Sequence, residues 1–153
     1  MQSMRSTYFA YGSNMNFEQM QTRCPGSVFL MPATLMRWRY FINSDGYAGI
    51  KKDDNSETYG CLWQLSEIHW QALDRYEGVR EGCYRRSQLN VITGANKTGE
   101  TVTGYLSNDE SYGVPSKPYQ SGVLRGAHQV GLPEHYINML ESWEKGYSLD
   151  LGK

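Results

Sequence analysis

The residues best suited to chemistry in this 153-residue chain are a glutamate beside a glycine and a glycine-containing turn. Glu77 falls on the margin of the apolar face of a predicted helix, immediately before Gly78. The C-terminal end of a helix is electrostatically negative, so this placement and partial burial would raise the pKa of the carboxyl toward the range useful for acid–base catalysis. A solvated glutamate paired with Arg75 or Arg80 is the simpler interpretation of the pattern alone.

The second candidate is the turn Gly12-Ser13-Asn14, which follows the aromatic run Thr7–Tyr11. Gly12 allows a ligand to approach the backbone closely, and the start of a helix leaves N–H groups unpaired. Such a turn binds a carboxylate or stabilises an oxyanion. An ordinary turn between a strand and a helix fits the same residues.

Other motifs carry less chemistry. The three histidines match no zinc-ligand spacing, and no Cys-x-x-Cys pair is present, so we expect no metal site. The segment Gly94–Thr101 has the glycine spacing of a phosphate-binding loop, but Glu100 replaces its lysine, and a hairpin turn explains it better. Ser13 lacks the second glycine of a nucleophile elbow.

Composition narrows the class of protein. Fifteen Lys and Arg balance 16 Asp and Glu, giving a net charge of −1 without charged runs, which argues against a nucleic-acid or membrane partner. Three cysteines favour free thiols in a reducing compartment. Apolar runs are too short to span a bilayer, and no secretory signal is apparent. We expect one cytoplasmic domain covering residues 1–153.

The elements that must position these residues alternate between strands and helices. Strands are expected at Thr7–Tyr11, Val28–Ile42 with a break or bulge at Pro32, Tyr47–Lys51, Thr58–Leu65, Tyr84–Ile92 and Thr101–Leu106, with a polar loop at Lys52–Ser56. Helices are expected at Asn16–Arg23 capped by Asn14, at Ser66–Glu77, from Ser116 to about Gln129, and onward from Pro133 as the first helical residue. The second helix should bury Ile68, Ala72, Leu73 and Tyr76 and leave His69 on its flank. The pattern predicts an α+β fold with a mixed sheet or small barrel.

Several of these segments together resemble the γ-glutamylcyclotransferase family. The run Tyr8-Phe9-Ala10-Tyr11-Gly12-Ser13-Asn14 is similar to its substrate-binding loop, and Leu73–Val79 is similar to the segment that carries its catalytic glutamate. Tyr105-Leu106, Pro115–Tyr119 and Gly126–Pro133 match in order and approximate spacing. The likeness extends from about Tyr8 to Trp143, and it favours the functional interpretation of both Glu77 and the Gly12 turn.

This resemblance implies a small barrel-like α+β fold with flanking helices and a reaction without a cofactor. The α-amine of a γ-glutamyl amino acid or dipeptide attacks its own γ-carbonyl, which yields 5-oxoproline and a free amino acid. Glu77 is then the catalytic acid and base. Substrate contacts are expected at Tyr8, Phe9, Ala10, Tyr11, Gly12, Ser13, Asn14, Tyr105 and Tyr119. The expected partner is this small molecule, and a homodimer is left open.

Three alternatives remain open on the sequence. One alternative is the same cyclisation of a γ-glutamylamine or another conjugate, although Asn14 after Tyr-Gly-Ser resembles the γ-glutamyl amino acid branch. A binding module would use the pocket for an amino-acid-like ligand without turnover. An amidohydrolase dependent on Ser13 would release glutamate instead of 5-oxoproline.

Overall fold

The aromatic run near the start of the chain forms the central strand, β1 (Ser6–Ala10), of a five-stranded mixed sheet. A computed structural model describes residues 5–144. The sheet order is β2-β3-β1-β5-β4, and the other strands are β2 (Val28–Ile42), β3 (Ala48–Leu65), β4 (Tyr84–Val91) and β5 (Glu100–Ser107). β1 pairs antiparallel with β3 and parallel with β5. Both of its faces are buried, as a central strand requires.

The sheet curls until its two edges meet. Thr34 of β2 and Ile92, just after β4, exchange two backbone hydrogen bonds of 2.9 Å. This contact removes part of the free strand edge, as closure into a barrel does. The expected barrel-like mixed sheet is therefore confirmed.

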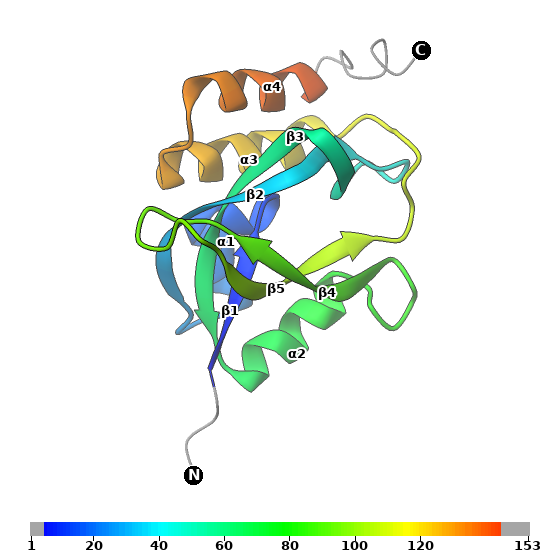
Figure 1. Ribbon diagram of the computed structural model, residues 1–153. Coiled ribbons are helices and arrows are strands. Elements are labelled where there is room, and N and C mark those ends of the chain that lie inside the picture. Colours follow the sequence, from blue (N-terminus) through cyan, green and yellow to red (C-terminus); the bar gives the residue numbers. More distant parts are fainter. Residues whose placement is uncertain (1–4, 145–153) are drawn as a thin grey trace.

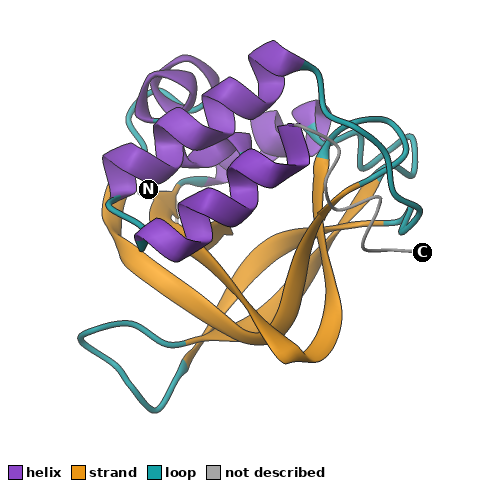
Figure 2. Ribbon diagram, turned by 90° about the horizontal axis from the view of Figure 1, so that it is seen from above, coloured by secondary structure: helices purple, strands orange, loops and turns teal. Residues whose placement is uncertain are grey.

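The helices pack around this curled sheet. They are η1 (Ser13–Met15, a short 3₁₀ turn), α1 (Phe17–Arg23), α2 (Glu67–Tyr76), α3 (Lys117–Val130) and α4 (Glu134–Glu144). In Figure 1, α2 lies at the lower end of the strands, and α3 and α4 lie at the upper end. Figure 2 shows the helices gathered on one side of the strands. The apolar core lies between these layers and includes Phe9, Leu62, Val123 and Ala127.

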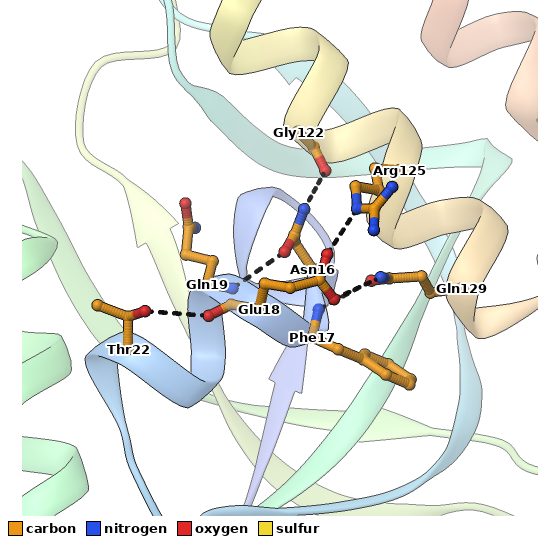
Figure 3. Close-up of polar contacts among 8 residues, drawn as sticks. All are labelled: Asn16, Phe17, Glu18, Gln19, Thr22, Gly122, Arg125 and Gln129. Atoms are coloured by element: carbon orange, nitrogen blue, oxygen red, sulfur yellow. Dashed lines mark hydrogen bonds and ion pairs between the residues drawn. The ribbon is translucent and has the colours of Figure 1, made fainter.

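Helix α3 holds the segment that follows β1 in place. A Cβ atom on Gly126 would lie 2.6 Å from the backbone nitrogen of Asn16, so only glycine allows α3 to approach this closely. Polar contacts extend the junction along α1 (Figure 3). Gln129 accepts from the backbone N–H of Phe17 at 2.8 Å and donates to Glu18 at 2.7 Å. The backbone beside Gly12 is thus fixed by a helix more than 100 residues away.

Two strand predictions needed correction. Lys52–Ser56 is not a separate loop, because β3 runs through it. The strand pairing passes from Trp38↔Lys52 to Met36↔Glu57. The four residues 53–56 therefore form a bulge opposite the single residue Arg37. The bulge is closed by Asp53, which accepts from the Asn55 backbone and the Ser56 hydroxyl. The irregularity near Pro32 lies between Phe29 and Met31, and Pro32 itself pairs with Cys61.

The predicted face of the second helix was also wrong in part. Ile68 is 70% exposed and Tyr76 is 56% exposed, whereas His69, Trp70 and Leu73 are buried. His69 is buried because its ring completes a capping box: Nδ1 accepts from the Ser66 N–H at 3.1 Å, and Nε2 lies 2.7 Å from the Pro25 carbonyl. Polar capping thus outweighed apolar periodicity in setting the buried face.

The first helix begins later than its expected cap. Asn16, not Asn14, caps α1 by accepting from the Gln19 N–H at 3.0 Å. Asn14 is instead buried within η1, where its side chain donates to the Tyr8 hydroxyl at 3.0 Å. The last helix starts at Glu134, one residue after Pro133.

Candidate active site

A cavity of about 450 Å³ lies where the ends of β1, α1 and α2 meet the turn between β2 and β3. This volume is within the usual range for small-molecule sites, about 300–1,000 Å³. Eight of the ten residues selected from the sequence line it: Tyr8, Tyr11, Gly12, Ser13, Asn14, Glu77, Tyr105 and Tyr119. The fold therefore places the Gly12 turn and Glu77, 65 positions apart in the chain, in one cavity.

Phe9 and Ala10 do not line the cavity. Their side chains are fully buried in the core, at 0% and 1% exposure. Successive side chains of a strand point to opposite faces, so the alternation that sends Tyr8 toward the cavity turns Phe9 away. The expected contact of these two side chains with substrate is not supported.

Glu77 ends the second helix as its C-cap. Its backbone N–H donates to the Leu73 carbonyl at 2.8 Å, which fixes the residue at the helix end. Burial raises the pKa of its carboxyl to about 7, and the positive charge of Arg23 partly opposes this shift. Within residues 5–144 the carboxylate forms no hydrogen bond or ion pair, so it is available to a ligand. A carboxyl with a pKa near 7 exchanges protons readily at neutral pH.

The Gly12 turn lines the same cavity and contains two backbone N–H groups that the described structure leaves unused. Gly12 and Ser13 accept from Met15 and Asn16 through their carbonyls, but their own N–H groups have no acceptor among the described residues. A Cβ atom on Gly12 would stand 3.0 Å from Ala48 Cβ and 3.4 Å from the Tyr119 hydroxyl. The absent side chain keeps this part of the cavity open.

The hydroxyl groups of four tyrosines in the cavity wall differ in what they can offer. Tyr11 donates to the Tyr105 carbonyl at 2.6 Å, and Tyr105 donates to Asp74 at 2.7 Å, so both protons are committed within the protein. Tyr8 accepts from Asn14, and Tyr119 accepts from the Ala48 N–H at 3.1 Å. Burial raises the pKa of Tyr119 to about 12 and raises that of Tyr8 as well. Both hydroxyls therefore keep a proton to donate.

Sequence reasoning missed the opposite wall of the cavity. Asn43 orders the turn between β2 and β3 by accepting from the backbone N–H groups of Asp45 and Tyr47. Tyr84 donates to the Ala48 carbonyl at 2.5 Å from β4. Arg23, at the end of α1, also lines the cavity. None of these residues belongs to a chemical motif; only the Asn-Ser-Asp-Gly turn signal marks Asn43.

In the described part of the chain, no three His, Cys, Asp or Glu side chains are grouped to hold a metal ion. No helix there is both long and apolar enough to cross a membrane. The segment near Gly94 is the connection between β4 and β5, as a hairpin predicts.

Comparison with known proteins defines the class. Residues 57–140 match the AIG2-like family. Gamma-glutamylcyclotransferase of Homo sapiens is 31% identical over 147 residues, covering 90% of this chain and 78% of that protein. The Mus musculus protein of the same name is 30% identical over 149 residues with the same coverage. A solved gamma-glutamyl cyclotransferase structure, 29% identical, superposes with a TM-score of 0.84 over 91% of this chain and 88% of its own.

The fold and these similarities define an AIG2-like α+β protein. The chain belongs to the AIG2-like, gamma-glutamylcyclotransferase family. The expected family and fold class are therefore confirmed.

Proposed function

We propose that this protein is a γ-glutamylcyclotransferase that converts a γ-glutamyl amino acid or dipeptide into 5-oxoproline and a free amino acid. One observation carries the proposal: a carboxyl whose pKa is raised to about 7, Glu77, shares a cavity of about 450 Å³ with the unpaired N–H groups of the Gly12 turn. Acid–base chemistry and oxyanion binding are the two functions that an intramolecular acyl transfer needs.

The reaction begins at the substrate's α-ammonium. Glu77, as carboxylate, takes a proton from this group, and the neutral amine then attacks the γ-carbonyl carbon of the same glutamyl chain. A new C–N bond closes the five-membered ring and the carbonyl oxygen becomes an oxyanion. Backbone N–H groups of Gly12 and Ser13 receive that charge, which is typically worth about 10²–10³ in rate for one donor.

Collapse of this intermediate breaks the original amide bond. The ring nitrogen gives up its second proton, and both protons pass through Glu77 to the departing nitrogen, which leaves as the ammonium of the free amino acid. The two protons lost by the ammonium equal the two gained by the leaving group, so the reaction consumes neither water nor acid. A carboxyl with a pKa near neutrality suits both directions of proton transfer.

The walls of the cavity hold the glutamyl chain in its bent form. Tyr8 and Tyr119 retain hydroxyl protons that can bind substrate oxygens. Tyr11 and Tyr105 supply ring surface, because their hydroxyls are committed to protein acceptors. Holding amine and carbonyl in contact lowers the entropic part of the barrier.

Product identity tests the proposal. Purified protein is incubated with γ-glutamyl-alanine, glutathione and a γ-glutamylamine, and 5-oxoproline and glutamate are quantified by mass spectrometry. We expect 5-oxoproline from at least one substrate, and loss of nearly all turnover in Glu77→Gln. Glu81→Gln is the matched control, because Glu81 is exposed just beyond the helix and does not line the cavity.

The other outcomes identify the alternatives. Glutamate instead of 5-oxoproline, lost in Ser13→Ala, would indicate an amidohydrolase. Binding of 5-oxoproline without turnover of any γ-glutamyl compound would indicate a binding module. Wild-type turnover in Glu77→Gln would overturn the assigned mechanism.

A further inference from the structure

A single cationic side chain stands at the cavity. Among the described residues that line it, Arg23 is the one lysine, arginine or histidine. It ends α1 and is half-buried. Its guanidinium lies over the ring of Tyr76, 4.4 Å from the centroid, and NH1 donates to Asn14 Oδ1 at 3.0 Å. These two contacts hold the guanidinium in a defined orientation.

Arg23 forms no ion pair with any anionic side chain among the described residues. The ion pairs formed within residues 5–144 are Arg86–Asp74 and Arg125–Glu18, and both lie elsewhere. Apart from the bond to Asn14, its N–H groups donate to nothing in the described structure. A fixed guanidinium with unused donors matches a planar carboxylate, which accepts two parallel hydrogen bonds from it.

The position of Arg23 indicates which carboxylate it meets. Tyr76, on which it stacks, is 56% exposed and so marks the mouth of the cavity, whereas Tyr8, Tyr11 and Tyr105 are buried and form the closed end. Ring closure at Glu77 places the glutamyl part inward. The leaving amino acid then projects toward the mouth.

Charge on the other wall supports the same orientation. Asp45 belongs to the turn between β2 and β3, and Asp109 follows β5. Hydrogen bonds from Ser111 and Ser44 lower the pKa of Asp109 to about 2, so it is ionised at neutral pH. An anionic substrate group is disfavoured beside these carboxylates and favoured beside Arg23.

We propose that Arg23 binds the α-carboxylate of the leaving amino acid and thereby selects γ-glutamyl amino acids over γ-glutamylamines. The inference rests on the proposed function, because it assigns the substrate class of that site. A γ-glutamylamine offers no carboxylate at this position, and Arg23 would stay unpaired when such a substrate is bound.

The test compares two substrates that differ only in this carboxylate: γ-glutamyl-alanine and γ-glutamyl-alaninamide. In Arg23→Met we expect the kcat/KM ratio of the first substrate to the second to fall by about 10- to 100-fold, as loss of a charge-assisted hydrogen bond predicts. The fall in this ratio should come mainly from a higher KM for γ-glutamyl-alanine. Using a ratio cancels any effect on Glu77, which acts on both substrates. Arg75→Met, an exposed arginine two residues before Glu77, is the control and should leave the ratio unchanged.

An equal loss of kcat/KM for both substrates in Arg23→Met would overturn the inference, because Arg23 would then act on the glutamyl part or on Glu77. Unchanged kcat/KM for both substrates would overturn it as well. Calorimetric binding of the same two compounds to Glu77→Gln, with and without Arg23→Met, separates this inference from the proposed function. Arg23-dependent preference for γ-glutamyl-alanine without turnover by the unmodified protein would reject the proposed function and support the inference. Turnover by the unmodified protein without an Arg23-dependent preference for γ-glutamyl-alanine would support the proposed function and reject the inference.

Discussion

The hydroxyl of Tyr105 donates to Asp74 Oδ1 at 2.7 Å, so a ring that borders the cavity is fastened from a residue that does not line it. Asp74 is held in turn by two hydrogen bonds from Arg86, at 2.9 and 2.6 Å. The wall beside Glu77 is therefore anchored through α2, β4 and β5 together. Tyr119 differs, because its hydroxyl accepts from the Ala48 N–H and donates to no acceptor in the hydrogen bonds of residues 5–144.

This contrast predicts different outcomes for two matched variants. Tyr105→Phe should lower the free energy of unfolding by about 1 kcal/mol and keep kcat/KM within about threefold, because only a structural hydrogen bond is lost. Tyr119→Phe should lower kcat/KM by about 10- to 100-fold, because a hydrogen bond to a charged substrate group contributes about 1.5–3 kcal/mol. Steady-state kinetics and chemical denaturation measure both. Equal losses of activity would mean that Tyr105 also binds substrate.

The pH dependence of the reaction should report the ionisation of Glu77. With a pKa of about 7 in the folded protein, its carboxylate form is depleted as pH falls below neutrality. As the base, it must be ionised to accept the substrate's proton, so kcat/KM should fall with a slope of one below pH about 7. In Arg23→Met the midpoint should move to higher pH, since Arg23 lowers the pKa of Glu77. A pH-independent kcat/KM between pH 5 and 8 is incompatible with this role.

The same carboxyl should destabilise the protein at high pH. Its pKa rises from 4.5 to about 7 on folding, so the folded state holds the proton more tightly, and stability is full below pH 4.5 and declines as pH rises to about 7. Glu77→Gln removes this decline. Relative to the unmodified protein, the variant should gain up to about 3 kcal/mol in unfolding free energy at pH 8, since one pKa unit corresponds to about 1.4 kcal/mol.

Calorimetry at pH 8 and pH 4.5 tests this prediction. The gain should shrink to a few tenths of a kcal/mol at pH 4.5, where the glutamate is protonated in the folded protein and about half protonated in the unfolded chain. Glu81→Gln should show no comparable gain at either pH. A loss of stability in Glu77→Gln at pH 8 would mean that the carboxylate is stabilised in the folded state by contacts other than those described.

Two glycine substitutions should act in opposite directions. Gly12→Ala places Cβ 3.0 Å from Ala48 Cβ and 3.4 Å from the Tyr119 hydroxyl, so the cavity wall must shift. We expect a cost of about 1 kcal/mol and a loss of activity larger than this cost explains. Gly122→Ala, within α3, meets nothing within 4 Å and should stabilise by about 0.5–1 kcal/mol with activity unchanged. Thermal unfolding and product assays on both variants check the signs.

Local physics accounts for the parts of the fold that were predicted correctly. The caps Ser66 and Ser116 and the left-handed Gly131 mark helix ends at the expected positions, because capping and positive φ depend on a few adjacent residues. The strand segments were found from their aromatic and β-branched runs. Where two local signals competed, as between the capping box of His69 and the apolar spacing of Ile68 and Tyr76, the sequence pattern did not decide the outcome.

The sequence by itself determined which residues could do chemistry: a glutamate at a helix end and a glycine turn after a strand, both tied to a family by neighbouring residues. Only the tertiary structure decided that Glu77 is buried enough to raise its pKa to about 7. It also decided that Phe9 faces the core, that Tyr105 turns its hydroxyl to Asp74, and that Arg23 enters the cavity. The reason is that desolvation and pairing depend on groups distant in the chain, which the curled sheet and α3 bring together.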